Sequence, residues 1–173
     1  MYSAFAETEP YTIAIRAKNS HAVSEAIVND AFWMMFARDV PFETAKTPYS
    51  STHPDGKEES GTVITAKKGS SAIFKIGSAE LVVTVKAIGG AGSSYSFTLA
   101  TKGWNKEEGA PPDPNGAVLD VSIDEEEQYS IASIRLSGLK DEAIQDYRHL
   151  IVMLASNLKS VVETGKPLIT PNR

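Results

Sequence analysis

The sequence predicts an α+β fold in which an antiparallel sheet packs against one long C-terminal helix. Three observations predict it. Six segments with alternating apolar residues lie between residues 61 and 139, a strand and helical segments precede them, and the longest helical pattern, 141–165, comes almost last. The turns between the six segments favour antiparallel pairing, because parallel neighbours need a long crossover. The 173 residues suit a single domain spanning 1–173 with a core of useful size.

The chain is expected to begin with a strand followed by two short helices. Alternation over 12–17 predicts the strand. Ser20 is a capping residue, and the segment that follows it, 21–30, has apolar residues at helical spacing. A second helix is expected over 31–40, and Pro41 ends it because proline cannot continue a helix.

The stretch 41–60 is expected to be a long, mobile surface loop. Its turn-forming residues are Pro41, Pro48, Pro54 and the pair Asp55–Gly56. Loops of this length are uncommon in compact domains and are often functional or disordered. A further loop is expected over 102–116, and residues 166–173 are expected to form a tail.

The alternation predicts which side chains of the strands face the core. The expected inward positions are Ala72, Phe74, Ile76, Leu81, Val83, Val85, Ala87, Tyr95, Phe97, Leu99, Ala117, Leu119, Val121 and Ile123. The last strand has a phase fault, since Tyr129 and Ile131 share one parity whereas Ile134 and Leu136 share the other. A β-bulge near Ala132–Ser133 would reconcile them, and the alternative is a strand with both faces partly covered.

The final helix carries a broad apolar stripe at three- and four-residue steps. Gly165 followed by Pro167 is a stop signal. A helix of about 25 residues is roughly 37 Å long at 1.5 Å per residue. It is longer than any strand here, so we expect it to lie across several strands.

Composition and motifs exclude several classes of function. A net charge of −5 argues against a nucleic-acid-binding protein, and the absence of cysteine excludes disulfides and thiolate metal sites. No segment approaches the roughly 18 apolar residues of a membrane span, and the N-terminus does not resemble a signal peptide, so a cytoplasmic protein is expected. The three histidines lack metal-ligand spacing, so no metal site is expected. No G-x-S-x-G motif supports a Ser-His-Asp site, and no cofactor is expected. A homodimer is left open.

Two segments resemble a known superfamily. TIAIRAKNSHAVSEAIVNDAFWMMFA (12–37) and YRHLIVMLASNLKSVVETGKP (147–167) are similar to the SRPBCC (START-related, birch-pollen-allergen-like) superfamily, nearest the family of the chaperone ATPase activator (Aha) C-terminal domain. The final helix of that family opens with tryptophan and ends in leucines, an acid and a glycine. Tyr147 stands at the tryptophan position, and the other matches are Leu154, Leu158, Glu163 and Gly165. The element order matches over nearly the whole chain, whereas the loops at 41–60 and 102–116 depart from the Aha-like pattern.

The resemblance implies a helix-grip fold, with the order β-α-α-β6-α, in which a curved antiparallel sheet wraps around the C-terminal helix and leaves a cavity between them. A bent sheet and a straight helix cannot be in contact everywhere, and unfilled space costs roughly 24 cal/mol per Å3, so a retained cavity indicates a bound molecule or a function. The residues expected to bind a ligand there are Trp33, Phe36, Phe74, Val83, Phe97, Leu119, Tyr147, Ile151 and Leu154.

Three functions remain open from the sequence. The first is non-catalytic binding of a small hydrophobic or amphipathic molecule, such as a lipid, in this cavity. The second, by analogy within the superfamily, is a polyketide cyclase or aromatase-like enzyme, for which the inward polar candidates are Tyr95, Ser133, Arg135 and Tyr147. The third, suggested by the Aha resemblance, is a chaperone-interacting module. Trp104, in the 102–116 loop, is expected either to act as a lid or partner contact or to cover the edge of the sheet.

Overall fold

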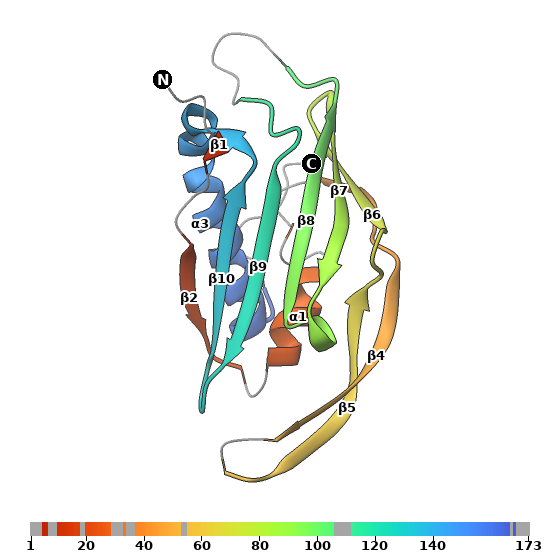
Figure 1. Ribbon diagram of the computed structural model, residues 1–173, viewed down its shortest axis with the longest axis vertical. Helices are drawn as coiled ribbons and strands as arrows, with labels where there is room; N and C mark the ends of the chain where they lie inside the picture. The colour runs from red at the N-terminus through yellow and green to blue at the C-terminus, as the bar shows by residue number, and fades with distance from the viewer. Residues whose placement is uncertain are drawn as a thin grey trace.

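A seven-stranded sheet curved around a long helix forms the frame of the protein (Figure 1). The computed structural model describes residues 5–6, 10–17, 20–28, 33, 37–52, 55–105, 112–166 and 168. The strands are β1 (Phe5–Ala6), β2 (Tyr11–Ile15), β3 (Ala37–Val40), β4 (Thr44–Thr52), β5 (Glu58–Ala66), β6 (Ser71–Ile76), β7 (Ala79–Ile88), β8 (Ser94–Lys102), β9 (Val118–Glu125), β10 (Ser130–Ser137) and β11 (Leu139–Lys140). The helices are α1 (Ser20–Val28), the 3-10 turn η1 (Gly90–Gly92) and α3 (Asp141–Thr164).

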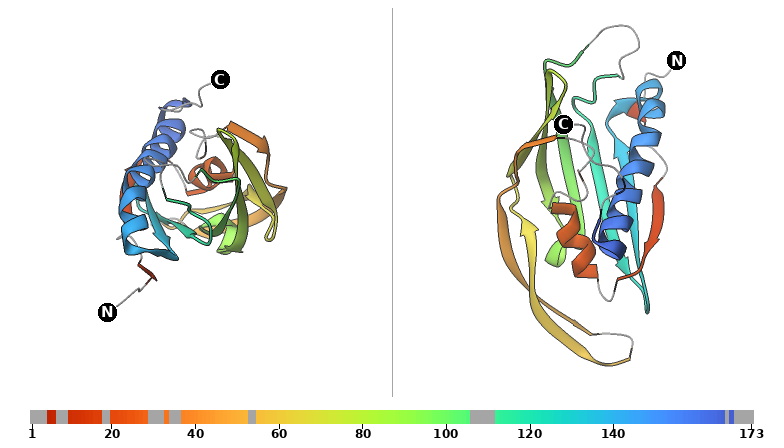
Figure 2. Two further views of the ribbon diagram at one scale, coloured as in Figure 1. Left: turned by 90° about the horizontal axis from the view of Figure 1, so that it is seen from above. Right: turned by 180° about the vertical axis from the view of Figure 1, so that it is seen from behind.

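The main sheet has the order β2-β10-β9-β8-β7-β6-β3, and every neighbouring pair is antiparallel. Two smaller antiparallel pairs, β1 with β11 and β4 with β5, lie outside it. Seen from above, the sheet bends so that α3 and α1 lie on its concave side (Figure 2). The predicted helix-grip arrangement of a curved sheet and a C-terminal helix is therefore confirmed.

Helix α3 has 24 residues and is about 36 Å long. It ends as predicted at Gly165, whose φ of 78° is left-handed and whose N–H donates to the Val161 carbonyl. The helix contacts β2, β10 and α1. Its buried side chains are Ile144, Tyr147, Ile151, Leu154, Ala155, Asn157 and Leu158. The apolar stripe predicted from the sequence is thus the face that meets the sheet.

The inward faces of the central strands agree with the alternation, with one local exception. On β8, Tyr95, Phe97 and Leu99 are buried as predicted. On β7, Leu81, Val83 and Val85 are buried but Ala87 is exposed, because the register with β8 shifts between Val85 and Ala87.

Strand β10 does not contain the predicted bulge. Its register with both β2 and β9 is continuous through Ala132 and Ser133. Ser130, Ala132, Ile134 and Leu136 are buried, whereas Ile131 and the other alternate residues are partly exposed. The alternative expectation, a strand with both faces partly covered, describes this strand.

The loop predicted over 41–60 is wrong for most of its described residues. β4 and β5 pair from Thr44↔Ala66 to Thr52↔Glu58, forming a hairpin that extends beyond the main sheet (Figure 1). Proline is tolerated at Pro48 because β4 is an edge strand. At Gly56 φ is 84°, and the Lys57 N–H donates to Asp55 Oδ1 over 2.9 Å, so the expected turn chemistry is present at the tip.

The second helix predicted over 31–40 is wrong over residues 37–40. These residues form β3, which pairs with β6 at the edge of the main sheet. Pairing with an exposed strand edge overrides the local helical pattern, since helix propensity is a weak preference. Trp33 has helical backbone, and the other residues of 29–36 lie outside the described part of the chain.

Candidate ligand-binding cavity

A cavity of about 260 Å3 lies between the N-terminal half of α3 and one end of the sheet. The sheet supplies the inward residues nearest that end, at the close of β6, β8 and β10 and the start of β7 and β9. These residues are Ile76, Leu81, Leu99, Leu119 and Leu136. Helix α3 supplies Tyr147, Leu150, Ile151, Met153 and Leu154. The inner wall formed by the described residues is therefore apolar.

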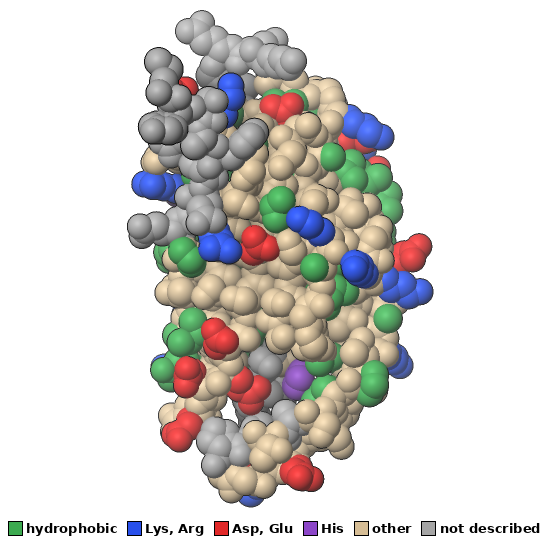
Figure 3. All heavy atoms as spheres, viewed as in Figure 1, with side chains coloured by type: hydrophobic (Ala, Val, Ile, Leu, Met, Phe, Trp, Pro, Cys, Tyr) green, Lys and Arg blue, Asp and Glu red, His purple; other side chains and the backbone are tan. Residues whose placement is uncertain are grey.

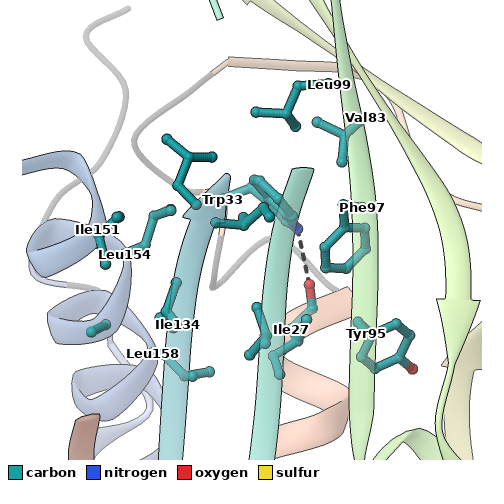
Figure 4. Close-up of a cluster of buried hydrophobic side chains, with 14 of the residues drawn as sticks. Ile27, Trp33, Val83, Tyr95, Phe97, Leu99, Ile134, Ile151, Leu154 and Leu158 are labelled. Atoms are coloured by element: carbon teal, nitrogen blue, oxygen red, sulfur yellow. Dashed lines mark hydrogen bonds between the residues drawn. The ribbon is translucent and has the colours of Figure 1, made fainter. Parts of the chain in front are cut away.

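Trp33 limits the cavity on its inner side. Its indole Nε1 donates a buried hydrogen bond of 2.9 Å to the Ile27 carbonyl at the end of α1 (Figure 4). The Trp33 ring packs edge-on against Phe97 at a centroid distance of 5.3 Å. It lies at a tilt against Phe74, at a centroid distance of 5.4 Å. Phe42 lies 5.7 Å from Phe97. This aromatic cluster fills the space between helix and sheet below the cavity.

The loop between β8 and β9 covers the mouth of the cavity. Its described residues Trp104 and Pro114 line the cavity. Asp113 orders this loop, because its Oδ1 accepts hydrogen bonds from Thr101 Oγ1 at 2.5 Å and from the Asn115 N–H at 3.0 Å. Trp104 is half-buried and lines the cavity.

Tyr147 connects the helix to this loop. Its hydroxyl donates a hydrogen bond to the Pro112 carbonyl. Burial is the main cause that raises the pKa of Tyr147, and the charges of Asp113 and Asp146 raise it further. The phenol therefore stays protonated and able to donate at any physiological pH.

The charged and titratable groups of the lining lie at the mouth. Among the described lining residues they are Asp146, Tyr147 and His149, and this set includes no lysine or arginine. Asp146 and His149 are exposed and stand three residues apart on α3. In the described residues no group of three His, Asp or Glu side chains is placed to hold a metal ion.

The residues predicted to bind a ligand fall into three groups. Trp33, Leu119, Tyr147, Ile151 and Leu154 line the cavity. Phe74, Val83 and Phe97 are buried in the core and are not among the lining residues, because Trp33 and its neighbours fill that part of the interior. Phe36 lies outside the described residues.

The polar residues considered for catalysis do not meet in the cavity. Tyr147 is at the cavity mouth, but the hydroxyl of Tyr95 is in the core, where it accepts a 3.4 Å hydrogen bond from the Ala66 N–H. Ser133 and Arg135 lie on the opposite, outer face of the sheet, where they line a separate hollow of about 420 Å3 together with Asp120 and Tyr95. Figure 3 shows this outer face, with charged side chains scattered over it.

Sequence reasoning missed several lining residues whose position could have been inferred. Leu81, Leu99 and Leu136 were recognised as apolar strand residues but were not assigned to the cavity. In an antiparallel sheet, the start of one strand and the end of the next lie at the same edge. The signal was therefore position along the strand: in each strand, the inward leucine nearest the edge of the sheet that carries the 102–116 loop lines the cavity.

In the part of the chain that the structure describes, no helix is both long enough and apolar enough to cross a membrane.

Solved structures with the same fold are similar to the chain over most of its length. DynU16, a protein in the dynemicin biosynthetic locus, aligns at 13% identity with a TM-score of 0.59, over 94% of this chain and 48% of that one. The Aha1 dimer from Colwellia psychrerythraea aligns at 14% identity with a TM-score of 0.59, over 93% of this chain and 98% of that one. Ara h 8.0201 aligns at 10% identity with a TM-score of 0.53, over 91% and 98%. The chain thus spans about half the length of DynU16.

No protein-family model and no curated protein sequence matches the chain. At the low identities of the structural matches, similarity establishes the fold, and function must be argued from the site. The likeness to Aha1 and to Ara h 8.0201 agrees with the resemblance carried by the first and last segments of the sequence. The chain has the same helix-grip fold as these solved structures.

Proposed function

We propose that the protein binds a small, largely apolar molecule in the cavity between α3 and the sheet, without chemical reaction. The proposal rests on where the apolar and the charged residues of the cavity lining lie. The described inner wall is made of leucine, isoleucine and tryptophan side chains, and the charged groups lie at the mouth. This is the arrangement of pockets that bind by apolar contact and orient the ligand with a few polar groups.

The size of the cavity supports an occupant. The apolar side chains around this space of about 260 Å3 lack the contacts that close packing would give them, and an apolar ligand would supply those contacts. The volume is near the lower end of the roughly 300–1,000 Å3 usual for ligand sites, which favours a small ligand.

Ligand binding in the cavity can be followed by tryptophan fluorescence. It contains two tryptophans, Trp33 and Trp104, and both line the cavity. Titration with a neutral probe, 1-octanol, should therefore change the intrinsic fluorescence and saturate. Native mass spectrometry of protein purified from its own cells would show a co-purified molecule directly.

A matched pair of helix variants tests the location. Leu150→Phe enlarges a half-buried side chain that lines the cavity, whereas Val152→Phe enlarges an exposed side chain on the same helix. The first should weaken octanol binding by about tenfold through lost volume, which corresponds to roughly 1.4 kcal/mol. The second should leave it unchanged. Equal affinities in the two variants, or no saturable binding to the unmodified protein, would contradict the proposal.

One observation favours an enzyme as the second candidate. Asp146 and His149 lie three residues apart on α3 and both line the cavity mouth, so an acid and a base stand near any ligand group that projects there. If the protein only binds, His149→Gln should keep the affinity for octanol. If it catalyses, turnover of an added substrate should depend on that imidazole. The chaperone-interacting alternative has no described feature that carries it and stays a prediction.

A further inference from the structure

We propose that the natural ligand is a cation at its polar end, such as a protonated amine on an apolar body, and that this end lies at the cavity mouth beside Asp146. The inference rests on the proposed function and specifies the chemistry of the same site. It concerns the two sides of the mouth, one formed by α3 and the other by the loop between β8 and β9.

One carboxylate lines the mouth, and a second stands near Tyr147 on the facing loop. Asp146 lines it from α3. Asp113 belongs to the facing loop, next to Pro112, whose carbonyl is bound by Tyr147. The described lining residues include no lysine or arginine that would compensate these charges. A ligand group with a negative charge would therefore meet repulsion on entering, and a positive one would meet attraction.

The hydrogen-bonding capacity of the mouth points the same way. The single proton of the Tyr147 hydroxyl is donated to the Pro112 carbonyl, so the phenol oxygen could only accept a hydrogen bond from a ligand. The carboxylates of Asp113 and Asp146 are acceptors as well. A ligand that completes hydrogen bonds here must bring donors, and an ammonium group brings three with a matching charge.

The pKa of Tyr147 indicates that negative charge is disfavoured in this region. After burial, the two carboxylates are the causes that raise the pKa of Tyr147, which means that they disfavour a negative phenolate at this place. The same field disfavours a ligand carboxylate. A test belongs near pH 8, where a primary amine is a cation and a carboxylic acid is an anion.

Three ligands with one tail separate the charge from the apolar contribution. Octylammonium, 1-octanol and octanoate are titrated into the full chain at about pH 8 and low ionic strength, with tryptophan fluorescence or calorimetry as the readout. The expected order of affinity is octylammonium, then octanol, then octanoate, with roughly tenfold between the first and the last. Added salt should reduce this ratio, because Asp146 is exposed to solvent.

A matched pair of variants assigns the preference to the mouth. Asp146→Asn removes the lining carboxylate, whereas Glu142→Gln removes an exposed carboxylate one turn earlier on α3 that does not line the cavity. The ratio of octylammonium to octanoate affinity should fall about threefold or more in the first variant and stay unchanged in the second.

The outcomes separate the two proposals. If all three ligands bind equally, or octanoate binds best, the cavity function stands and the inference of a cationic ligand is wrong. If the ratio is the same in Asp146→Asn and in the unmodified protein, the inference is also wrong. If none of the three binds, the proposed function fails and the inference fails with it.

Discussion

The hydroxyl of Tyr147 donates a hydrogen bond to the main-chain carbonyl of Pro112, which joins the N-terminal half of the cavity-lining helix α3 to the loop between β8 and β9. The same loop supplies Trp104 and Pro114 to the cavity. Tyr147 therefore has two roles. Its ring forms part of the apolar wall, and its hydroxyl holds the covering loop.

Tyr147→Phe should loosen the loop while preserving the wall. The lost hydrogen bond is worth about 0.5–1.5 kcal/mol, and the half-exposed Pro112 can be solvated instead, so we expect a modest loss of stability. Ligand release should be faster by a few-fold, since the loop closes the mouth. Stopped-flow fluorescence with 1-octanol measures the release rate. Tyr129→Phe, which removes the hydroxyl of an exposed tyrosine, is the control and should change neither quantity.

Alkaline pH should destabilise the protein partly through Tyr147. Its pKa is raised in the folded state by burial and by Asp113 and Asp146, so the folded protein holds the proton more tightly than the unfolded chain does. The resulting stability is complete below the ordinary tyrosine pKa of about 10 and is lost as pH rises above it. Urea unfolding followed from pH 8 to pH 11 should show this loss. A Tyr147→Phe variant with the same slope as the unmodified protein would contradict the assignment.

The two tryptophans should differ in their effect on stability. Trp33→Phe leaves the buried Ile27 carbonyl without its donor and removes volume from the aromatic cluster, so it should cost about 2–4 kcal/mol. Trp104→Phe alters a half-buried side chain at the cavity mouth and should cost less than about 1 kcal/mol. Urea denaturation compares the two variants. A larger loss for Trp104→Phe would show that the loop, rather than the cluster, supports the core.

The sequence predicted the elements that have one buried face. On β8, Tyr95, Phe97 and Leu99 alternate with polar residues, because one side meets the core and the other meets solvent. β4 could not be recognised in this way. None of its described side chains is buried, since the hairpin extends past the main sheet, and its strand conformation comes from pairing with β5. Such pairing depends on residues distant in sequence and leaves no apolar alternation in the strand itself.

The sequence predicted the candidate site only in part, because periodicity identifies inward side chains but not the space between them. The helix residues Tyr147, Ile151 and Leu154 follow from the apolar stripe of α3. Whether Phe74 and Phe97 meet a cavity depends on where the Trp33 ring lies between helix and sheet, which is a question of three-dimensional packing. Periodicity shows which side chains point inward but does not show which inward space is left unfilled.

Two glycines of η1 give a matched test of packing where this turn meets α1. At Gly92, φ is +77°, and a Cβ would lie 2.1 Å from Ser24 Oγ of α1 and 3.2 Å from the Tyr95 hydroxyl. Gly92→Ala combines a left-handed backbone with this clash and should cost about 3 kcal/mol or more. Gly90→Ala adds a Cβ with no atom within 4 Å and should change the unfolding free energy by less than about 1 kcal/mol.

The clash at Gly92 can be isolated by removing the atom that causes it. Ser24→Ala takes away the hydroxyl nearest to the added Cβ, so the double variant with Gly92→Ala should recover part of the lost stability, on the order of 1 kcal/mol, relative to the sum of the single changes. The backbone contribution should remain, because the φ of Gly92 is unchanged. Chemical denaturation of the four proteins in this cycle measures the coupling. Strict additivity of the two changes would mean that α1 moves away from η1 at no cost, and that this contact does not fix the position of the helix.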